Sequence, residues 1–345
     1  MWLKRFVSWR YFRRWLSWLE MRKDWDRRAR QNARHFIDCG HGGSDREFWT
    51  SGCVDLDQTI LRDLEVSAES TVVEIGCGIG RLLRPFSEKT QLAVGFDISR
   101  EMVTQGRALN RDRANLRLVL TSGRLTGLRR ATVDLVYSFI VFQHMPDRRA
   151  ILRYLAEAAR VLKGGGVFRF QLDGRADNPR RTADTWDGAR FTQREIEDHL
   201  RKNRMEVIDH AGEGTAYSWF TARRLEEPGR ARTSLVRFQA RVWNLPELLK
   251  LLKRLGCDPK PTAEKLLADD LSLRQLAERF DSEQVPVQAK PYVSSAYQVF
   301  LGRNVDEGGL DFYSRMIEAG IEPLNVVDCL LGSPEFADRY RQRAT

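Results

Sequence analysis

Between about residue 71 and residue 223, short apolar runs rich in β-branched residues alternate with stretches of helical periodicity. This alternation is typical of an α/β architecture, a doubly wound and mostly parallel sheet with helices on both faces. The last two runs are separated by a short Gly-Glu-Gly connection that leaves no room for a crossover helix, so these strands should pair antiparallel at the edge of a seven-stranded sheet. We expect strands at 71–76, 91–98, 116–121, 133–141, 166–172, 205–211 and 216–223, and helices near 80–88, 100–109, 148–162 and 192–203.

The pattern changes after Arg223, where prolines interrupt short helical runs and no convincing strand follows. Residues 251–284 and 300–336 also align at an offset of roughly fifty residues, which indicates a weak two-copy helical repeat. We therefore predict four segments, namely a basic aromatic N-terminal helix at 1–30, the α/β domain at 31–226, a helical connector at 227–285 and a helical interaction domain at 286–345.

Positive charge is concentrated at the start of the chain. The 345 residues include 57 Lys or Arg and 47 Asp or Glu, for a formal net charge of +10, and residues 1–30 alone hold ten basic against three acidic residues. The same segment holds five of the nine tryptophans. A basic aromatic helix suits an anionic membrane surface or nucleic acid. Its apolar positions spread around most of the helical wheel, however, and this favours tryptophans that pack on the protein's own domains.

The cysteines bear on the cellular compartment. They are five in number, widely spaced and without a CxxC pair, which favours a reducing cytoplasm and offers no zinc or redox motif. No stretch approaches the 18 consecutive apolar residues of a membrane-spanning helix, and the N-terminus lacks the continuous apolar core of a signal peptide. We therefore expect a cytoplasmic protein, peripheral at most at the inner membrane face, with no metal.

The sequence TVVEIGCGIGRLL at 71–83 places a glycine turn directly after a buried strand. Small residues in such a turn let the backbone approach a bound nucleotide. The spacing is G-x-G-x-G, with Arg81 where a dinucleotide site has its third glycine. Glu74, two residues before the first glycine, would repel a diphosphate but would orient the cationic amino-acid end of S-adenosylmethionine. Asp97 ends the next strand and is placed to accept hydrogen bonds from ribose hydroxyls in either kind of site.

Together with D-x-S-x-x-M from Asp97 to Met102 and DLVYSFIVFQHMPD at 134–147, this glycine motif resembles the class I S-adenosylmethionine-dependent methyltransferases of the small-molecule branch. The resemblance covers roughly residues 45–225. It implies a Rossmann-like fold with S-adenosyl-L-methionine as the cofactor. It also implies cofactor contacts from Glu74, Gly76, Cys77, Gly78, Gly80, Arg81, Asp97, Ile98, Met102, Ser122, Gly123, Arg124, Leu125 and Phe139.

Two positions depart from that family's pattern. Ser122 stands where the family usually has an Asp that accepts from the adenine amino group, so the contact would come from Ser122 or from a neighbouring backbone group. The run Leu-Lys-Gly-Gly-Gly at 162–166 replaces L-K-P-G-G, which predicts a looser end to the preceding helix.

His144 follows the fourth long strand and is the best-placed candidate for a catalytic base, because an unperturbed imidazole titrates near neutral pH. Enzymes of this family also commonly have a His here that lines the pocket without acting as a base, so both roles stay open. The segment at 30–52, with His41, Asp45 and Trp49, is a candidate lid. The candidate acceptor-binding residues are Trp49, Gln143, Arg175 and Trp186.

The loop at 173–189 after the fifth strand is long for this kind of fold and is a candidate acceptor-binding element. Its arginines, Arg175, Arg180 and Arg181, lie near Trp186 in the sequence, and this combination suits a sugar phosphate, a nucleotide sugar or another anion. A solvated surface loop is the equally simple alternative.

Residues 296–340 resemble a bacterial helical domain of unknown function, with the pattern Y-x-x-x-L-G-R followed by D, G and S-P-E-F. Relatives of that domain occur in surface-layer and polysaccharide-associated proteins and beside glycosyl- and methyltransferases, which implies a module that binds a protein partner. We therefore hypothesise O-methylation of a sugar in a cell-surface glycan or glycolipid precursor. An N- or C-methyltransferase of a small metabolite is the alternative. An RNA methyltransferase is less favoured, because FQHM at 142–145 replaces the N/D-P-P-Y/F motif that grips a flipped base.

Overall fold

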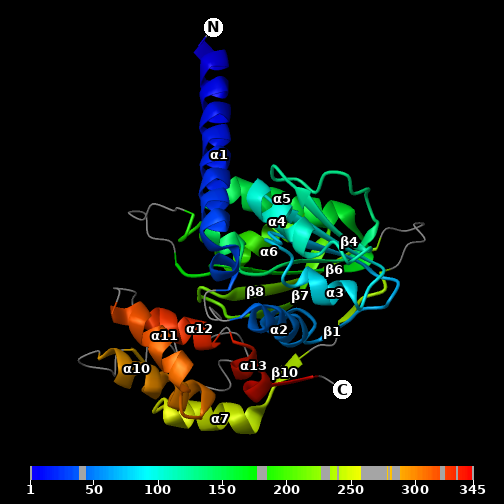
Figure 1. Cartoon of the computed structure of the whole chain (residues 1–345). Coiled ribbons are helices and arrows are strands. Elements are labelled where there is room, and N and C mark those ends of the chain that lie inside the picture. The colour runs from blue at the N-terminus through cyan, green and yellow to red at the C-terminus, as the bar shows by residue number, and fades with distance from the viewer. Residues whose placement is uncertain are drawn as a thin grey trace.

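The computed structural model is built around a seven-stranded sheet, as the sequence predicts (Figure 1). Its strands are β2 (Thr71–Ile75), β3 (Leu92–Asp97), β4 (Leu116–Leu120), β5 (Val133–Ser138), β6 (Leu162–Leu172), β7 (Met205–Ala211) and β8 (Ser218–Arg224). The order is β4-β3-β2-β5-β6-β8-β7, and β8 runs antiparallel to both of its neighbours, so the antiparallel pair at the sheet edge is confirmed. The structure describes residues 2–38, 44–176, 185–226, 234–238, 241–257, 278, 280–281, 288–318, 323–331 and 333–343.

The glycine run at 162–166 behaves differently from the prediction. The preceding helix, α5 (Arg148–Val161), ends before the run, and Leu162 already pairs with Val133 as the first residue of β6. The predicted loose helix end is therefore wrong, because Leu162 is already extended, with a ψ of 138°, and the chain passes directly from helix to strand. The register of β5 and β6 shifts across this run, because Val133 pairs with Leu162 whereas Leu135 pairs with Val167.

Helices cover both faces of the sheet and divide its core in two. On one face α5 and α6 (Gln193–Lys202) bury Val73, Val94 and Val136. On the other face α3 (Leu83–Ser87) and α4 (Arg100–Leu109) bury the alternate strand residues Val72, Ala93 and Leu135. This alternation is the two-residue period of strands that are buried on both sides.

The N-terminal helix α1 (Trp2–Ile37) runs through the predicted boundary at residue 30 and is kinked shortly after it, at Asn32, whose φ of −169° and ψ of 92° are non-helical (Figure 1). Its first half extends away from the sheet, whereas its second half packs along the α/β domain. Asp26 Oδ1 accepts hydrogen bonds from Ser99 Oγ at 2.6 Å and from Glu101 N at 3.0 Å, so α1 supplies part of the cap of α4. Helix α2 (Asp45–Asp55) follows and lies against the glycine turn, because the Arg81 guanidinium bonds to Ser51 Oγ and Asp55.

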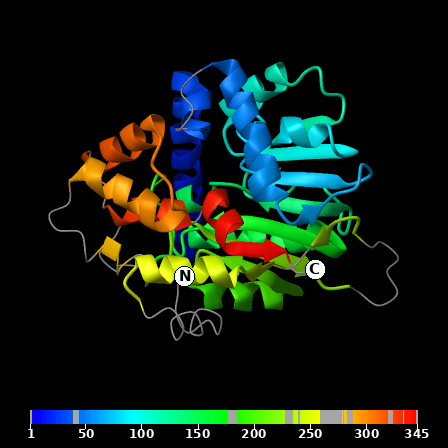
Figure 2. The ribbon, with the colours of Figure 1, turned by 90° about the horizontal axis from the view of Figure 1, so that it is seen from below.

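The C-terminal region has a hydrophobic core of its own, and Figure 2 shows it beside the α/β domain. Its described helices are α7 (Leu245–Arg254), α10 (Ala289–Ala296), α11 (Glu307–Glu318), α12 (Leu324–Leu331) and α13 (Pro334–Tyr340), with a π-helical turn at Tyr297–Leu301. Within the described part of the chain, side-chain contacts join it to the α/β domain. Arg62 pairs with Asp338 at 2.8 Å, the Cys329 thiol donates to Tyr217 Oη at 3.3 Å, and Arg175 bonds to Asn325. Most of the first copy of the predicted repeat lies outside the described residues.

The expectation of no strand after Arg223 is wrong. Strand β9 (Arg237–Phe238) pairs with β1 (Leu64–Glu65), and β10 (Arg241–Trp243) pairs with β11 (Arg341–Arg343), in both cases antiparallel. These ladders are two or three residues long and rich in arginine, so they lack the apolar alternation by which a strand is recognised in a sequence. Among the described residues, no helix is long and apolar enough to cross a membrane.

Candidate active site

The glycine turn after β2 adopts backbone conformations that favour glycine. Gly76, Gly78 and Gly80 have φ angles of 77°, 52° and 90°, a region in which other residues are strained. A Cβ on Gly76 would lie 2.4 Å from Val141, and the amide of Gly76 donates to Phe96 O at 2.7 Å. The turn is therefore drawn against β3 and the segment after β5, with its backbone exposed to the space above the strand ends.

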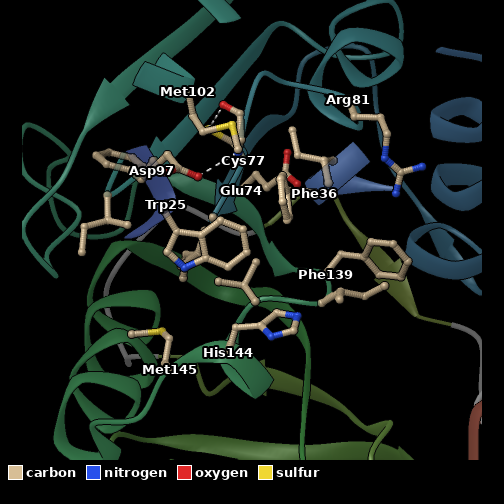
Figure 3. A pocket seen from close by; sticks show the side chains of 18 of the residues that line it. Trp25, Phe36, Glu74, Cys77, Arg81, Asp97, Met102, Phe139, His144 and Met145 are labelled. Carbon is tan, nitrogen blue, oxygen red and sulfur yellow. Dashed lines mark hydrogen bonds between the residues drawn. The ribbon is translucent and has the colours of Figure 1, made fainter. Parts of the chain in front are cut away.

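Asp97 is fixed at the end of β3 by backbone amides. Its Oδ2 accepts from Gly78 N and its Oδ1 from Ser99 N, each at 2.8 Å, so the carboxylate joins the glycine turn to the start of α4 (Figure 3). Burial raises the pKa of Asp97 to about 6, against the lowering effect of these two hydrogen bonds. Met102 and Ile98 line the same cavity beside it.

Glu74 is 4% exposed and accepts a hydrogen bond from Tyr137 Oη at 3.0 Å. Burial raises its pKa to about 8, the Arg81 charge lowers it, and the Asp97 charge raises it further. Burial also raises the pKa of the neighbouring Cys77 thiol. Two carboxyl groups that are held back from ionising in one cavity favour a cationic ligand, because a positive charge restores their ionised forms.

Arg81 occupies the position where a dinucleotide fold has its third glycine. Its Nη1 contacts Asp55 at 2.6 Å, Ser51 Oγ at 3.1 Å and Asp38 at 3.4 Å. Its Nε is buried and has no hydrogen-bond partner in the described part of the chain. Arg81 is one of the residues that line the cavity, and its charge suits an anionic group of a ligand.

The cavity itself has a volume of about 900 Å³, including the space open to solvent at its mouth. Its lining includes the carboxyl groups of Glu74 and Asp97, the glycine turn, Arg81, Phe139 and His144 (Figure 3). Much of its remaining wall comes from α1 and is apolar or aromatic. Two of these residues lie in the candidate lid at 30–52, and the sequence analysis did not assign the other three to the site. These wall residues are Trp18, Met21, Trp25, Phe36 and Ile37.

His144 lies on this wall beside Trp25, with ring centroids 5.8 Å apart. Its Nδ1 lies 2.8 Å from the carbonyl oxygen of Trp186, and the two rings are 5.2 Å apart. The structure thus brings His144 and Trp186 together, although they are far apart in the sequence. Gln143 bridges two partners, because its Oε1 accepts from Gln171 Nε2 and its Nε2 lies 3.4 Å from His144 Nε2.

Several predicted site residues lie away from this cavity. Trp49 packs against Phe48 and beneath Arg84, and Arg175 pairs with Asp173 at 2.8 Å and with Asp187 at 3.6 Å. Gly80 packs toward Asn110 instead of facing the cavity. The turn after β4 with Ser122, Gly123, Arg124 and Leu125 is also outside the lining, and Trp18 of α1 covers Gly123. His41, Arg180 and Arg181 are outside the described residues.

The residues present fit S-adenosylmethionine. Glu74 and Asp97 suit its cationic and hydroxyl groups, Arg81 Nε suits its carboxylate, and the aromatic wall suits its adenine ring. Within the described ranges, no group of three or more His, Cys, Asp or Glu side chains could hold a metal ion.

Comparisons with known proteins agree with this fit. Residues 73–170 match a family model described as a methyltransferase domain, and residues 276–340 match a domain of unknown function (DUF4214). No curated protein matches the sequence.

Three solved structures illustrate the likeness of fold. A chain of the complex between the Haloferax volcanii Trm112 methyltransferase activator and the putative methyltransferase is 20% identical, with 59% of this chain and 98% of that chain covered and a TM-score of 0.45. Phosphoethanolamine N-methyltransferase 1 of Haemonchus contortus is 15% identical, with coverages of 89% and 72% and a TM-score of 0.48. The magnesium protoporphyrin IX methyltransferase of Synechocystis PCC 6803 is 16% identical, with coverages of 55% and 93% and a TM-score of 0.41.

The sheet order, the glycine turn with its two buried carboxyl groups and the match over residues 73–170 lead to one conclusion: the α/β part of the chain is a class I S-adenosylmethionine-dependent methyltransferase domain, with S-adenosylmethionine as its cofactor.

Proposed function

We propose that this methyltransferase methylates a hydroxyl group of a sugar in a cell-surface glycan or glycolipid precursor. The observation that carries the O-methyl part is the contact between His144 Nδ1 and Trp186 O. A backbone carbonyl accepts hydrogen bonds but cannot donate them, so the proton of the neutral imidazole resides on Nδ1. Nε2 then carries the lone pair that a general base needs. Since His144 also lines the cofactor cavity, the base and the methyl donor share one space.

The residues divide the work as follows. Glu74 holds the ammonium group, Asp97 the ribose hydroxyls and Arg81 the carboxylate of the bound cofactor. When bound, S-adenosylmethionine would supply a methyl group to an oxygen nucleophile, with its S–CH3 bond broken and S-adenosylhomocysteine left as the product. His144 Nε2 removes the proton from the acceptor hydroxyl as the new C–O bond forms. Apolar walls keep water out, so alignment of the two reactants supplies much of the rate.

The sugar part of the proposal rests on the aromatic surroundings of His144. Trp186 is 49% exposed and Trp25 lines the cavity, so aromatic rings lie on two sides of the imidazole. The face of an aromatic ring packs against the C–H face of a sugar ring and leaves its hydroxyls directed at the polar groups of the site. The guanidinium beside Trp186 is that of Arg28, 5.1 Å from the ring, in the place where the sequence analysis expected Arg175.

Labelled S-adenosylmethionine tests this proposal. The purified full chain would be incubated with nucleotide sugars, lipid-linked glycans, tRNA and small amines, and transfer of label to each would be measured. We expect label in a glycan fraction. Label confined to amines would favour the N-methyltransferase alternative, and label confined to tRNA would overturn the glycan assignment.

His144→Gln is the matched variant for the chemical step. We expect kcat to fall by about 100-fold or more, because a positioned general base contributes on the order of 10² to 10⁴ in rate. Calorimetric binding of adenosylhomocysteine should stay within about twofold of that of the unaltered chain, since the cofactor's polar contacts come from other residues. An unchanged kcat would remove His144 from the reaction.

We further propose that the first half of α1 docks on anionic lipid at the inner face of the cytoplasmic membrane, where lipid-linked acceptors are found, and that the C-terminal helices bind a protein partner. The support is the basic aromatic composition of residues 1–17 and their direction away from the domain (Figure 1). Flotation with vesicles rich in anionic lipid should recover the full chain but not a form lacking residues 1–17. Equal flotation of the two forms would rule out this role.

A further inference from the structure

Arg28 connects α1 to the loop that carries Trp186. Its side chain is buried, with 8% of the residue exposed, and its guanidinium lies 4.7 Å from the Trp25 ring and 5.1 Å from the Trp186 ring. It pairs with Asp24 at 2.9 Å. It also donates to Thr185 O at 3.2 Å and to Thr185 Oγ1 at 3.3 Å, and Thr185 in turn bonds to Asp24. A planar guanidinium suits this arrangement, because it stacks on aromatic rings while its edge donates.

The same loop is pressed against the turn that carries His144. Gly188 N donates to Gln143 O at 2.7 Å, and Ala189 N donates to Met145 O at 2.9 Å. A Cβ on Gly188 would lie 2.6 Å from Gln143 O and from Met145 N, so a glycine is needed for the approach. These backbone contacts hold the loop at Gly188 and Ala189, and the Arg28 contacts hold it three residues earlier, at Thr185.

Between these two points lies the Trp186 carbonyl that accepts from His144 Nδ1. A free imidazole favours the other tautomer, with its proton on Nε2. Here the Trp186 carbonyl at Nδ1 selects the Nδ1–H form, and the Gln143 amide nitrogen, 3.4 Å from Nε2, favours the same form. In other enzymes, too, the group bound to one ring nitrogen decides the role of the other.

We propose that Arg28 is a positioning residue for methyl transfer. By clamping Thr185 and Trp186 to α1, it keeps the Trp186 carbonyl on His144 Nδ1 and so keeps the lone pair of Nε2 toward the acceptor. This inference rests on the proposed role of His144 as the base. It makes the N-terminal helix part of the catalytic arrangement as well as a wall of the cofactor cavity.

Nitrogen-15 NMR of histidine-labelled full-length protein at about pH 8 tests the clamp without any acceptor. The His144 signals are assigned by their loss in His144→Gln. We expect the unaltered chain, and the control Lys23→Ala at an exposed cation on the same helix, to show the proton on Nδ1. Arg28→Ala should show a mixture shifted toward the Nε2–H form. Retention of the pure Nδ1–H form in Arg28→Ala would overturn the proposal.

Two further measurements separate this proposal from other failures. Binding of adenosylhomocysteine to Arg28→Ala shows that the variant is folded, and Asp24→Asn, which loosens the same clamp, should give the same NMR result if Arg28→Ala does not fold. With an acceptor from the label experiment, Arg28→Ala should lower kcat by about tenfold while the KM for S-adenosylmethionine changes little. If the tautomer shifts in Arg28→Ala but His144→Gln remains active, Arg28 does position the Trp186 carbonyl, and His144 is not the base.

Discussion

At the scale of single residues, the carboxyl of Glu74 couples the site to pH. Burial raises its pKa to about 8, so in the empty cavity it is mostly protonated at neutral pH. A cationic ligand favours the ionised form, and binding must therefore release a proton. Linkage then requires that affinity rise with pH until the carboxyl is already ionised before binding.

We therefore expect the affinity for S-adenosylmethionine to rise between about pH 6 and pH 8, by up to about tenfold per pH unit. Asp97, whose pKa burial raises to about 6, adds to the dependence below that window. Calorimetry in buffers of different ionisation enthalpy measures both the affinity and the released proton. Glu74→Gln should bind more weakly at pH 8 and lose this dependence. A pH-independent affinity of the unaltered chain would contradict the assignment of Glu74 to the cationic end.

At the scale of elements, the second half of α1 is a wall of the cofactor cavity held by its contacts with α4. Asp26 accepts from Ser99 Oγ and Glu101 N, and Gln105 Nε2 donates to Ala29 O at 3.2 Å. Arg22 adds a bond from its Nε to Ile98 O at 3.1 Å. The helix is thus attached to the same end of β3 that holds Asp97.

Asp26→Ala should weaken this attachment. We expect a loss of about 1–2 kcal/mol in the free energy of unfolding, typical of a lost carboxylate cap, measured by urea denaturation. Hydrogen exchange should rise in residues 18–37 before it rises in the sheet. Glu20→Ala, at an exposed acid on the same helix, is the control and should change neither quantity. Equal exchange in both variants would argue against the α4 contact as the attachment.

The elements also show what the sequence reveals and what it hides. Glu74, Asp97 and the glycine turn follow from it because strand, turn and helix are neighbours along the chain, where spacing carries the geometry. The wall residues Trp18, Met21 and Trp25 are missed because the helical wheel covers residues 2–19. That range combines the half of α1 that projects from the domain with only the beginning of the half that packs on it. Their spacing of three and four residues, continued by Ala29 and Ala33, forms a stripe that emerges when the helix is read from residue 18 onward.

Other site residues depend on pairings between distant segments that no local pattern reports. The contact of Trp186 with His144 and the cover of Trp18 over Gly123 join loops to helices across the fold. The cofactor contact of Ser122 was expected because the family usually has its adenine-binding residue directly after this strand, β4. In this chain, Trp18 of α1 lies over the adjacent Gly123.

At the scale of the whole molecule, the chain combines two cores, and the N-terminal helix belongs to the first of them. Met21 is part of the sheet core, and Trp18 and Trp25 pack against it. Because these residues line the cofactor cavity, we propose that the methyltransferase domain begins near residue 18, whereas the sequence analysis placed its start at residue 31.

Two truncations should distinguish these boundaries. A chain lacking residues 1–17 should bind adenosylhomocysteine within about twofold of the full chain, because no described wall residue is removed. A chain lacking residues 1–30 should lose about tenfold or more in affinity, since Trp18, Met21 and Trp25 go with it. Calorimetry on both forms, with circular dichroism to verify folding, provides the measurement. Equal affinities would show that the helix wall contributes nothing to binding.

The attachment of α1 to distant parts of the chain also has a consequence for how the protein matures. Its hydrogen bonds reach partners 76, 99 and 157 residues further along. Closing such long loops is entropically costly and slow compared with local pairing. A helix synthesised this far ahead of its partners should therefore be among the last elements to dock, so that nascent chains pass through a stage in which the sheet is formed, the cofactor site lies open and the basic aromatic helix is exposed.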